Sequence, residues 1–120
     1  MKPYLAVVLF PVPLVFADRF VAINQQAARR YHQLGAAGTE ILQLTDGTAK
    51  YGCRSLAAAI TLKEDETLFM VLDRFRDKDH FNEVDALVGQ DASCRALFDD
   101  LTAIIDISSS VRLECESATA

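Results

Sequence analysis

Two adjacent and opposite charges interrupt an apolar stretch of the sequence, and they are the side chains best placed to do chemistry. Asp73 and Arg74 lie in the strand-like run 67–75, whose other residues are mostly hydrophobic. Successive side chains of a strand point to opposite faces, and a charge that meets a covered surface needs a partner or a pocket. One hypothesis makes Asp73 a base that lines a cavity, or Arg74 an anchor for an anion. The sequence favours the alternative, in which the strand is ending and both charges reach solvent.

Polar residues also mark one face of the last strand-like segment. Arg112 and Glu114 alternate there with apolar neighbours, and Gln43 can occupy the corresponding face of its own strand. A partly polar sheet face suits a wet ligand pocket. It suits equally well an edge strand with one solvated side, so the sequence leaves both interpretations open.

Three further residues are candidates for a site. His80, close to Asp77, could form an acid/base pair, but acidic residues in the first turn of a helix ordinarily complement the helix dipole. Tyr51 and Cys53 fall in the irregular stretch 50–63, and loops often carry functional groups. A cysteine such as Cys53 is more often an unreactive thiol than an activated one. The pocket candidates among these three residues are therefore Tyr51 and His80.

The composition predicts no metal or cofactor site. The three cysteines form no CxxC pair, and the chain has only two histidines, which argues against zinc. We therefore expect free thiols in a reducing compartment, no cofactor and no metal.

Charge and hydropathy limit the partners. The net charge is −5, from 17 acidic and 12 basic residues that form no basic stripe, so nucleic acid is not an expected partner. No apolar run reaches the roughly 18 residues that a membrane span needs. The stretch from Lys2 to Phe16 has the outline of a secretory leader, but Pro11 and Pro13 break it and favour a strand. We expect a cytoplasmic protein without a membrane partner.

The elements that must position these residues follow from the spacing of the apolar residues. Continuous or alternating apolar runs predict strands, and apolar residues spaced by three or four predict helices. Pro11 ends the first strand, and Asn24 falls with the polar residues of the first helix. Asp77 can cap the second helical stretch, which Gly89 interrupts. The predicted elements are a strand at 4–10, a helix at 14–34, a strand at 39–45, a short helix at 55–60, a strand at 67–75, a helix at 78–106 and a strand at 109–116.

This β-α-β-β-α-β order predicts an α+β fold of the ferredoxin-like type. Its core is a four-stranded antiparallel sheet with helices on one face. The chain shows no internal repeat and no linker, so we expect a single domain at 1–120 with a frayed tail at 117–120.

Several segments carry a resemblance to a known family. They are the helix end from Tyr31 to Ala36, the strand 40–43, the stretch 58–69 and the charged helix start at 76–79. Together they resemble the dimeric α/β-barrel proteins of the ferredoxin-like superfamily, and within it the YbaA-like family of bacterial proteins of unknown function. That family supplies no established catalytic residues, so the resemblance assigns none here.

The resemblance implies a homodimer, because sheets of this superfamily pair across a two-fold axis. The sequence agrees: both faces of 4–10 and 67–75 are largely apolar, while only two helical stretches are available to cover one face. Soluble monomers rarely expose a large apolar patch. We therefore expect a symmetric homodimer.

Three functions remain open at this point. The leading hypothesis is a homodimer that binds a small molecule in a pocket between sheet and helices. A second is a cofactor-free enzyme, like the monooxygenases or isomerases of the superfamily, and a third is a structural or regulatory dimer without a ligand. An enzyme should place a titratable group in an enclosed cavity, whereas a structural dimer should fill that space with side chains.

Overall fold

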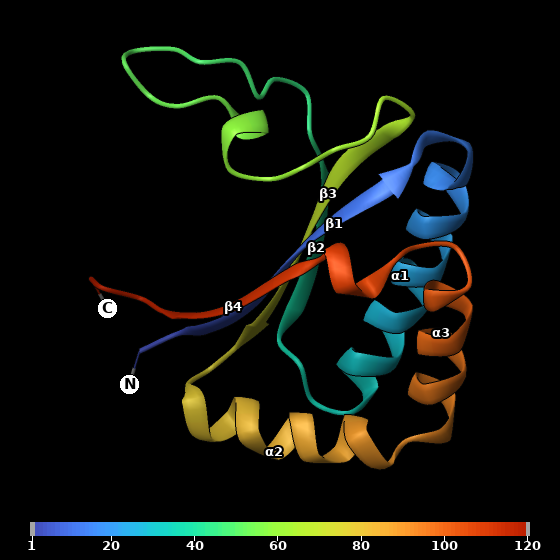
Figure 1. Cartoon of the computed structure of the whole chain (residues 1–120). Coiled ribbons are helices and arrows are strands. Elements are labelled where there is room, and N and C mark those ends of the chain that lie inside the picture. Colours follow the sequence, from blue (N-terminus) through green and yellow to red (C-terminus); the bar gives the residue numbers. More distant parts are fainter. Residues whose placement is uncertain (1, 120) are drawn as a thin grey trace.

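The computed structural model describes residues 2–119 and contains a four-stranded antiparallel sheet with α-helices packed on one side (Figure 1). The strand order across the sheet is β2-β3-β1-β4, which confirms the predicted ferredoxin-like α+β fold. The elements are β1 (Tyr4–Pro13), α1 (Ala17–Gln33), β2 (Gly38–Gln43), β3 (Glu66–Phe75), α2 (Lys78–Gln90), α3 (Ala92–Thr102) and β4 (Val111–Glu116).

The first strand is longer than predicted, because it continues through both prolines. Pro11 pairs with Leu68 across the ladder, so the expectation that Pro11 ends the strand was wrong. The pairing of β1 with β4 stops at Leu9. Leu14 N donates to Asp65 O at 2.7 Å, in register with the ladder of β1 and β3. The backbone N–H groups of the even-numbered residues of β1 therefore point toward β3. The nitrogen atoms of Pro11 and Pro13 point the other way, toward the side of β4, whose pairing has already ended. A missing N–H is tolerated at such an edge.

The second helical stretch divides at Asp91, close to the interruption that Gly89 indicated. Asp77 Oδ1 accepts a hydrogen bond from His80 N at 2.8 Å and caps α2, as the sequence suggested. The predicted short helix at 55–60 is only a 3-10 turn at Leu56–Ala58, and no side chain caps it. No helix within residues 2–119 is long and apolar enough to cross a membrane.

The segment between β2 and β3, residues 44–65, projects away from the sheet (Figure 1). Its start is held by a hydrogen bond from Leu44 N to Leu68 O at 2.9 Å. Tyr51 is 99% exposed in this segment and has a φ of 57°, the left-handed region that non-glycine residues rarely adopt. The C-terminal tail, predicted to be frayed from residue 117, begins with a hydrogen bond from Ser117 N to Pro3 O at 2.9 Å. Its last residue, Ala120, lies outside the described residues.

The core between sheet and helices divides into two clusters. In the first, Phe20 of α1 lies between Phe10 and Phe69, with ring centroids 5.2 and 4.7 Å away. In the second, Phe81 of α2 packs on Tyr4 and Phe75, at 5.3 and 5.0 Å. Between the clusters lie two directly paired polar residues, Thr39 of β2 and Asp73 of β3.

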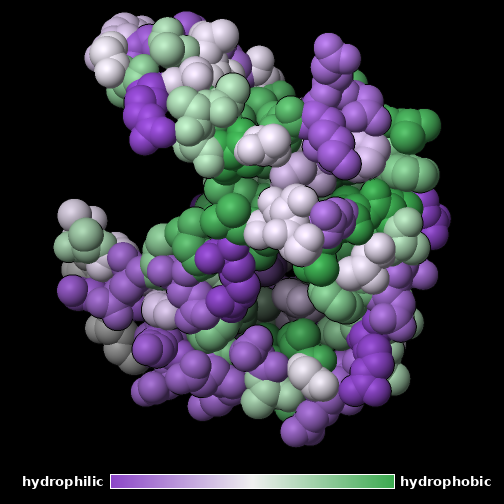
Figure 2. Space-filling view, in the orientation of Figure 1, coloured by the Kyte–Doolittle hydropathy of each residue, from purple (hydrophilic) through white to green (hydrophobic). Residues whose placement is uncertain are grey.

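The opposite side of the sheet is mainly apolar apart from the ion pair of Arg74 with Glu40, and no helix of the described residues covers it. We call it the open face; strand register and alternation assign to it Leu5, Val7, Leu9, Leu42, Met70, Leu72, Val111 and Leu113. Figure 2 shows a hollow between segment 44–65 and the rest of the molecule, with hydrophobic residues at its inner end.

A two-pronged ion pair holds α3 against α1. Arg30 donates from Nε to Asp91 Oδ2 at 3.1 Å and from Nη2 to Oδ1 at 2.5 Å. The same carboxylate caps α3, accepting a hydrogen bond from Cys94 N at 2.9 Å. The hydrogen bond from Arg30 and, to a smaller extent, the one from Cys94 N hold the pKa of Asp91 well below its usual range. Because the folded pKa is lowered, the stabilisation is present above the unfolded value of about 4 and is lost as pH falls through the folded pKa.

We predict a graded loss of stability at this position. Asp91→Asn keeps a capping oxygen but removes the charge that Arg30 meets, whereas Asp91→Ala removes both. At pH 7 the free energy of unfolding should fall from wild type to Asp91→Asn to Asp91→Ala in urea titrations. The gap between wild type and Asp91→Asn should narrow as the pH is lowered below about 4. Asp99→Asn, an exposed change on the same helix, serves as control. An Asp91→Asn variant as stable as wild type at pH 7 would show that the ion pair contributes nothing.

Candidate functional site

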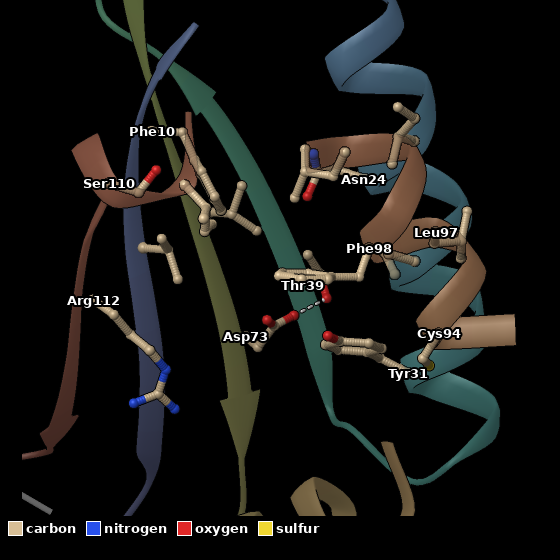
Figure 3. Close-up of a pocket in the computed structure, with 17 residues that line it drawn as sticks. Phe10, Asn24, Tyr31, Thr39, Asp73, Cys94, Leu97, Phe98, Ser110 and Arg112 are labelled. Carbon is tan, nitrogen blue, oxygen red and sulfur yellow. Dashed lines mark hydrogen bonds between the residues drawn. The ribbon is translucent and has the colours of Figure 1, made fainter. Parts of the chain in front are cut away.

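A cavity of about 410 Å³ lies between the sheet and the helices α1 and α3 (Figure 3). This volume is within the range of roughly 300–1,000 Å³ typical of small-molecule sites. The cavity occupies the space between the two core clusters, where α1 presents the short side chains of Ala27 and Ala28 toward the sheet. Most of its wall is apolar, formed among others by Val8, Phe10, Ile23, Val71, Leu97 and Phe98.

Asp73 is the acidic group of the cavity. Thr39 Oγ1 donates a hydrogen bond to Asp73 Oδ1 at 2.5 Å, between directly paired residues of β2 and β3. Burial raises the pKa of Asp73, and the bond from Thr39 opposes that rise. The carboxylate forms no ion pair within residues 2–119. It is therefore a half-buried acid whose second oxygen is available to a ligand.

Tyr31 stands beside Asp73 in Figure 3. Burial, and then the negative charge of Asp73, raises the pKa of Tyr31 to about 12. The phenol is thus neutral at physiological pH. Its hydroxyl makes no hydrogen bond to another described residue, so it can both donate to and accept from a bound molecule.

Two more polar side chains in the cavity wall have unused hydrogen-bonding capacity. Asn24 is only 8% exposed; its Nδ2 donates to Phe20 O at 2.9 Å, while its Oδ1 receives no hydrogen bond from the described residues. Ser110 Oγ is buried and has no partner among residues 2–119. Buried polar groups are normally satisfied, so Ser110 Oγ calls for a partner from outside the protein, and Asn24 Oδ1 is an accessible acceptor in the same wall.

Arg112 lies at the more exposed side of the cavity, and its charge is already balanced. Its Nη1 donates to Glu114 Oε2 at 2.6 Å, and its guanidinium lies 5.9 Å from the centre of the Phe81 ring. The other oxygen of Glu114 accepts from Tyr4 Oη at 2.6 Å. The bonds from Tyr4 and Arg112 lower the pKa of Glu114. Arg112 is therefore held by protein groups rather than left free for an anion.

Cys94 is the buried thiol in the cavity wall, and its surroundings do not activate it. Burial, and then a hydrogen bond with Asp91, raises the pKa of Cys94 to about 11, which keeps the thiol protonated. Within residues 2–119, no cluster of three or more histidine, cysteine or acidic side chains is arranged to hold a metal ion.

Of the six residues that the sequence singled out, the structure brings Asp73 and Arg112 to the cavity. The favoured expectation that Asp73 reaches solvent was wrong, because β3 continues to Phe75 and helices cover this face. Arg74 does reach solvent on the opposite face, where it pairs with Glu40. Alternation along the strand separates the two neighbours.

The other three candidates lie outside the cavity. His80 is buried in the second cluster, where its Nδ1 accepts from Arg76 N at 3.0 Å and its ring packs edge-on against Phe75. Tyr51 is on the projecting segment, and Gln43 is exposed at the end of the edge strand β2. All three were predicted to line a pocket because their polarity was visible in the sequence and their position relative to the cavity was not.

Sequence reasoning missed Asn24, Tyr31, Thr39 and Ser110 as site residues. Asn24 was assigned to the polar side of α1, but it follows Phe20 by four residues and faces the sheet with it. That spacing was the available signal. Thr39 and Ser110 carry no such signal, since only the packing of helices over the sheet shows that they face a cavity.

Three solved structures share the fold. SnoaB, described as a cofactor-independent oxygenase from Streptomyces nogalater, has a TM-score of 0.65 and 14% identity over 100% of this chain and 97% of its own. A dimeric ferredoxin-like protein from an uncultured marine organism has a TM-score of 0.67 and 10% identity, covering 100% and 99%. A dimeric ferredoxin-like protein of unknown function from Thermobifida fusca has a TM-score of 0.51 and 13% identity, covering 97% and 92%. Identities this low show the fold alone.

The sequence comparisons place the chain in a family. A comparison with curated proteins found no match. The model of one family, described as protein of unknown function (DUF1428), matches residues 3–102, which is most of the chain. The narrower YbaA-like assignment made from the sequence stays a prediction. This chain belongs to the DUF1428 family.

Proposed function

We propose that the protein is a homodimer that binds a small molecule in the cavity between sheet and helices. The observation that carries the proposal is the cavity itself, about 410 Å³ of space between two well-packed clusters. The cavity opens to the surface, and concave sites of this size with mainly apolar walls and a few polar groups are the usual places where proteins bind small molecules.

The polar groups of the cavity wall support an occupant. A buried polar group that lacks a hydrogen bond costs about 1–3 kcal/mol. Ser110 Oγ is such a group among the described residues, and Asn24 Oδ1 and the second oxygen of Asp73 offer further acceptors to a ligand. A ligand, or water in its absence, can satisfy them.

The open face supports the homodimer. Leu42, Val111 and Leu113 are 42%, 45% and 39% exposed on it, although all three are large and hydrophobic. Contiguous apolar surface of this kind marks an interaction site. Two structures of the same fold are described as dimeric, which agrees with a partner on this face.

A cofactor-free enzyme is the second candidate function, and Asp73 is the observation that favours it. A carboxylate whose pKa is raised by burial inside a cavity is suited to act as a general base. One structure of the same fold is described as a cofactor-independent oxygenase. A structural dimer without a ligand is the weakest of the three candidates, because side chains leave the cavity unfilled.

We retain a single cytoplasmic domain as part of the proposal. Cys53, Cys94 and Cys115 are all free thiols, as in a reducing compartment. Cys94 is buried in the cavity wall, and Cys53 and Cys115 are exposed.

We predict that Ala27→Leu blocks ligand binding. The larger side chain fills part of the cavity that Ala27 and Asp73 both line, and it adds apolar contact, so the melting temperature should be unchanged or raised. Native mass spectrometry of freshly purified protein should show a bound molecule with wild type and none with Ala27→Leu. Ala22→Leu, on the exposed side of the same helix, should keep it. A molecule retained by Ala27→Leu would place the binding site elsewhere, and a wild type that never binds any molecule would remove the proposal.

We predict that a charge on the open face separates the protomers. Wild type should elute with twice the chain mass of 13.2 kDa in chromatography with light scattering. Leu113→Lys should elute as a monomer with an unchanged far-ultraviolet circular dichroism spectrum, because a lysine at the centre of an apolar interface loses its hydration. Val15→Lys, at a position 84% exposed outside the open face, should stay dimeric. A monomeric wild type would contradict the homodimer.

A further inference from the structure

The cavity holds a negative charge that no basic residue of the described chain balances. Arg74, its neighbour in sequence, points to the other face of the sheet and pairs with Glu40. Arg112, which lines the cavity, is bound to Glu114. The hydroxyl of Thr39, which donates a hydrogen bond to Asp73, carries no charge. Charges taken out of water are normally paired, so Asp73 calls for a cation.

We propose that the ligand of this cavity is an organic cation, an ammonium group on an apolar body, bound with its charge at Asp73. This inference rests on the proposed binding function and names the chemical class of the ligand.

The wall of the cavity matches both parts of such a molecule. Phe10, Tyr31 and Phe98 contribute aromatic rings, whose faces attract cations, and the rest of the wall is mainly aliphatic. An ammonium group has only donors to offer, and Asp73 with the neighbouring Tyr31 hydroxyl presents oxygen acceptors at the same place (Figure 3). Asn24 Oδ1 provides another acceptor farther along α1 for a second donor on the ligand.

The other ionisable groups facing Asp73 do not supply or compete for this charge. Tyr31 on α1 and Cys94 on α3 have pKa values raised to about 12 and about 11, so both are neutral at physiological pH. On β4, Arg112 and Glu114 neutralise each other. An anionic ligand would instead meet the carboxylate of Asp73 in a site of low polarity and be repelled.

The pH dependence of binding follows from the same carboxylate. Burial raises the pKa of Asp73 in the free protein, and a bound cation favours the ionised form and lowers it. Affinity for an amine should therefore increase as the pH rises through the pKa of free Asp73 and then stay constant near neutrality. It should fall again only where the amine loses its proton.

Three probes with the same apolar body separate the alternatives. We would titrate 2-phenylethylamine, 2-phenylethanol and phenylacetate into ¹⁵N-labelled protein and follow the amide signals of β3 and α1. The amine should bind most tightly, with shifts centred on Asp73 and Tyr31. Asp73→Asn keeps a side chain that Thr39 can bond to but removes the charge; it should weaken amine binding at least about 30-fold, the effect of losing one partner of a buried charge pair. Asp99→Asn, an exposed change on α3, should leave amine binding unchanged.

Each other outcome decides against the inference. Equal affinity for the alcohol and the amine, tighter binding of phenylacetate, or an Asp73→Asn variant with wild-type amine affinity would overturn the cationic ligand and leave the binding function intact. Failure of all three probes to shift any cavity signal would count against the binding function as well. If Asp73→Asn does not fold, the wild-type affinity between pH 4 and 7 gives the same answer, since an affinity that does not rise with pH overturns the proposal.

Discussion

The pairing of β1 with β3 is the constraint on which the rest of the structure depends. Ten residues of each strand pair, from Tyr4 with Phe75 to Pro13 with Glu66. This register decides which side chains face the helices and which form the open face. A slip of one residue would exchange the two sets and move Asp73 out of the cavity. The pairing of these two mainly apolar strands thus determines that Asp73 faces the cavity.

The sizes of the side chains between sheet and helices determine both the packing of the core and the position of the cavity. Large aromatic side chains fill the space on either side, around Phe20 and around Phe81. Between them the side chains that face the cavity are short, with Thr39 on β2 and Ala27 on α1. Larger residues there would bury more apolar surface. The core is therefore less tightly packed beside Asp73, which has no cationic partner among the described residues. Such a pattern is expected of sites where function competes with stability.

Local patterns predicted the elements well and the site only in part. The spacing of apolar residues indicated the element order, and Asp77 was recognised as a cap because its role depends on neighbours in sequence. The extent of β1 was missed, since whether a proline is tolerated depends on where β4 ends. Asp73 and Arg112 were found because charge in an apolar strand is visible in the sequence. Thr39 and Ser110 were not, because ordinary polar residues acquire meaning only when distant segments enclose them.

Segment 44–65 is hydrogen-bonded near its two ends, from Leu44 N to Leu68 O and from Leu14 N to Asp65 O, and it contributes no strand to the described sheet. The entropy of closing a loop between two fixed ends grows slowly, by about 0.6 kcal/mol for each doubling of its length. Changes in its length therefore have little effect on the folding free energy of the sheet. We therefore expect this region to tolerate insertions, deletions and new residues that the strands framing the cavity would not tolerate.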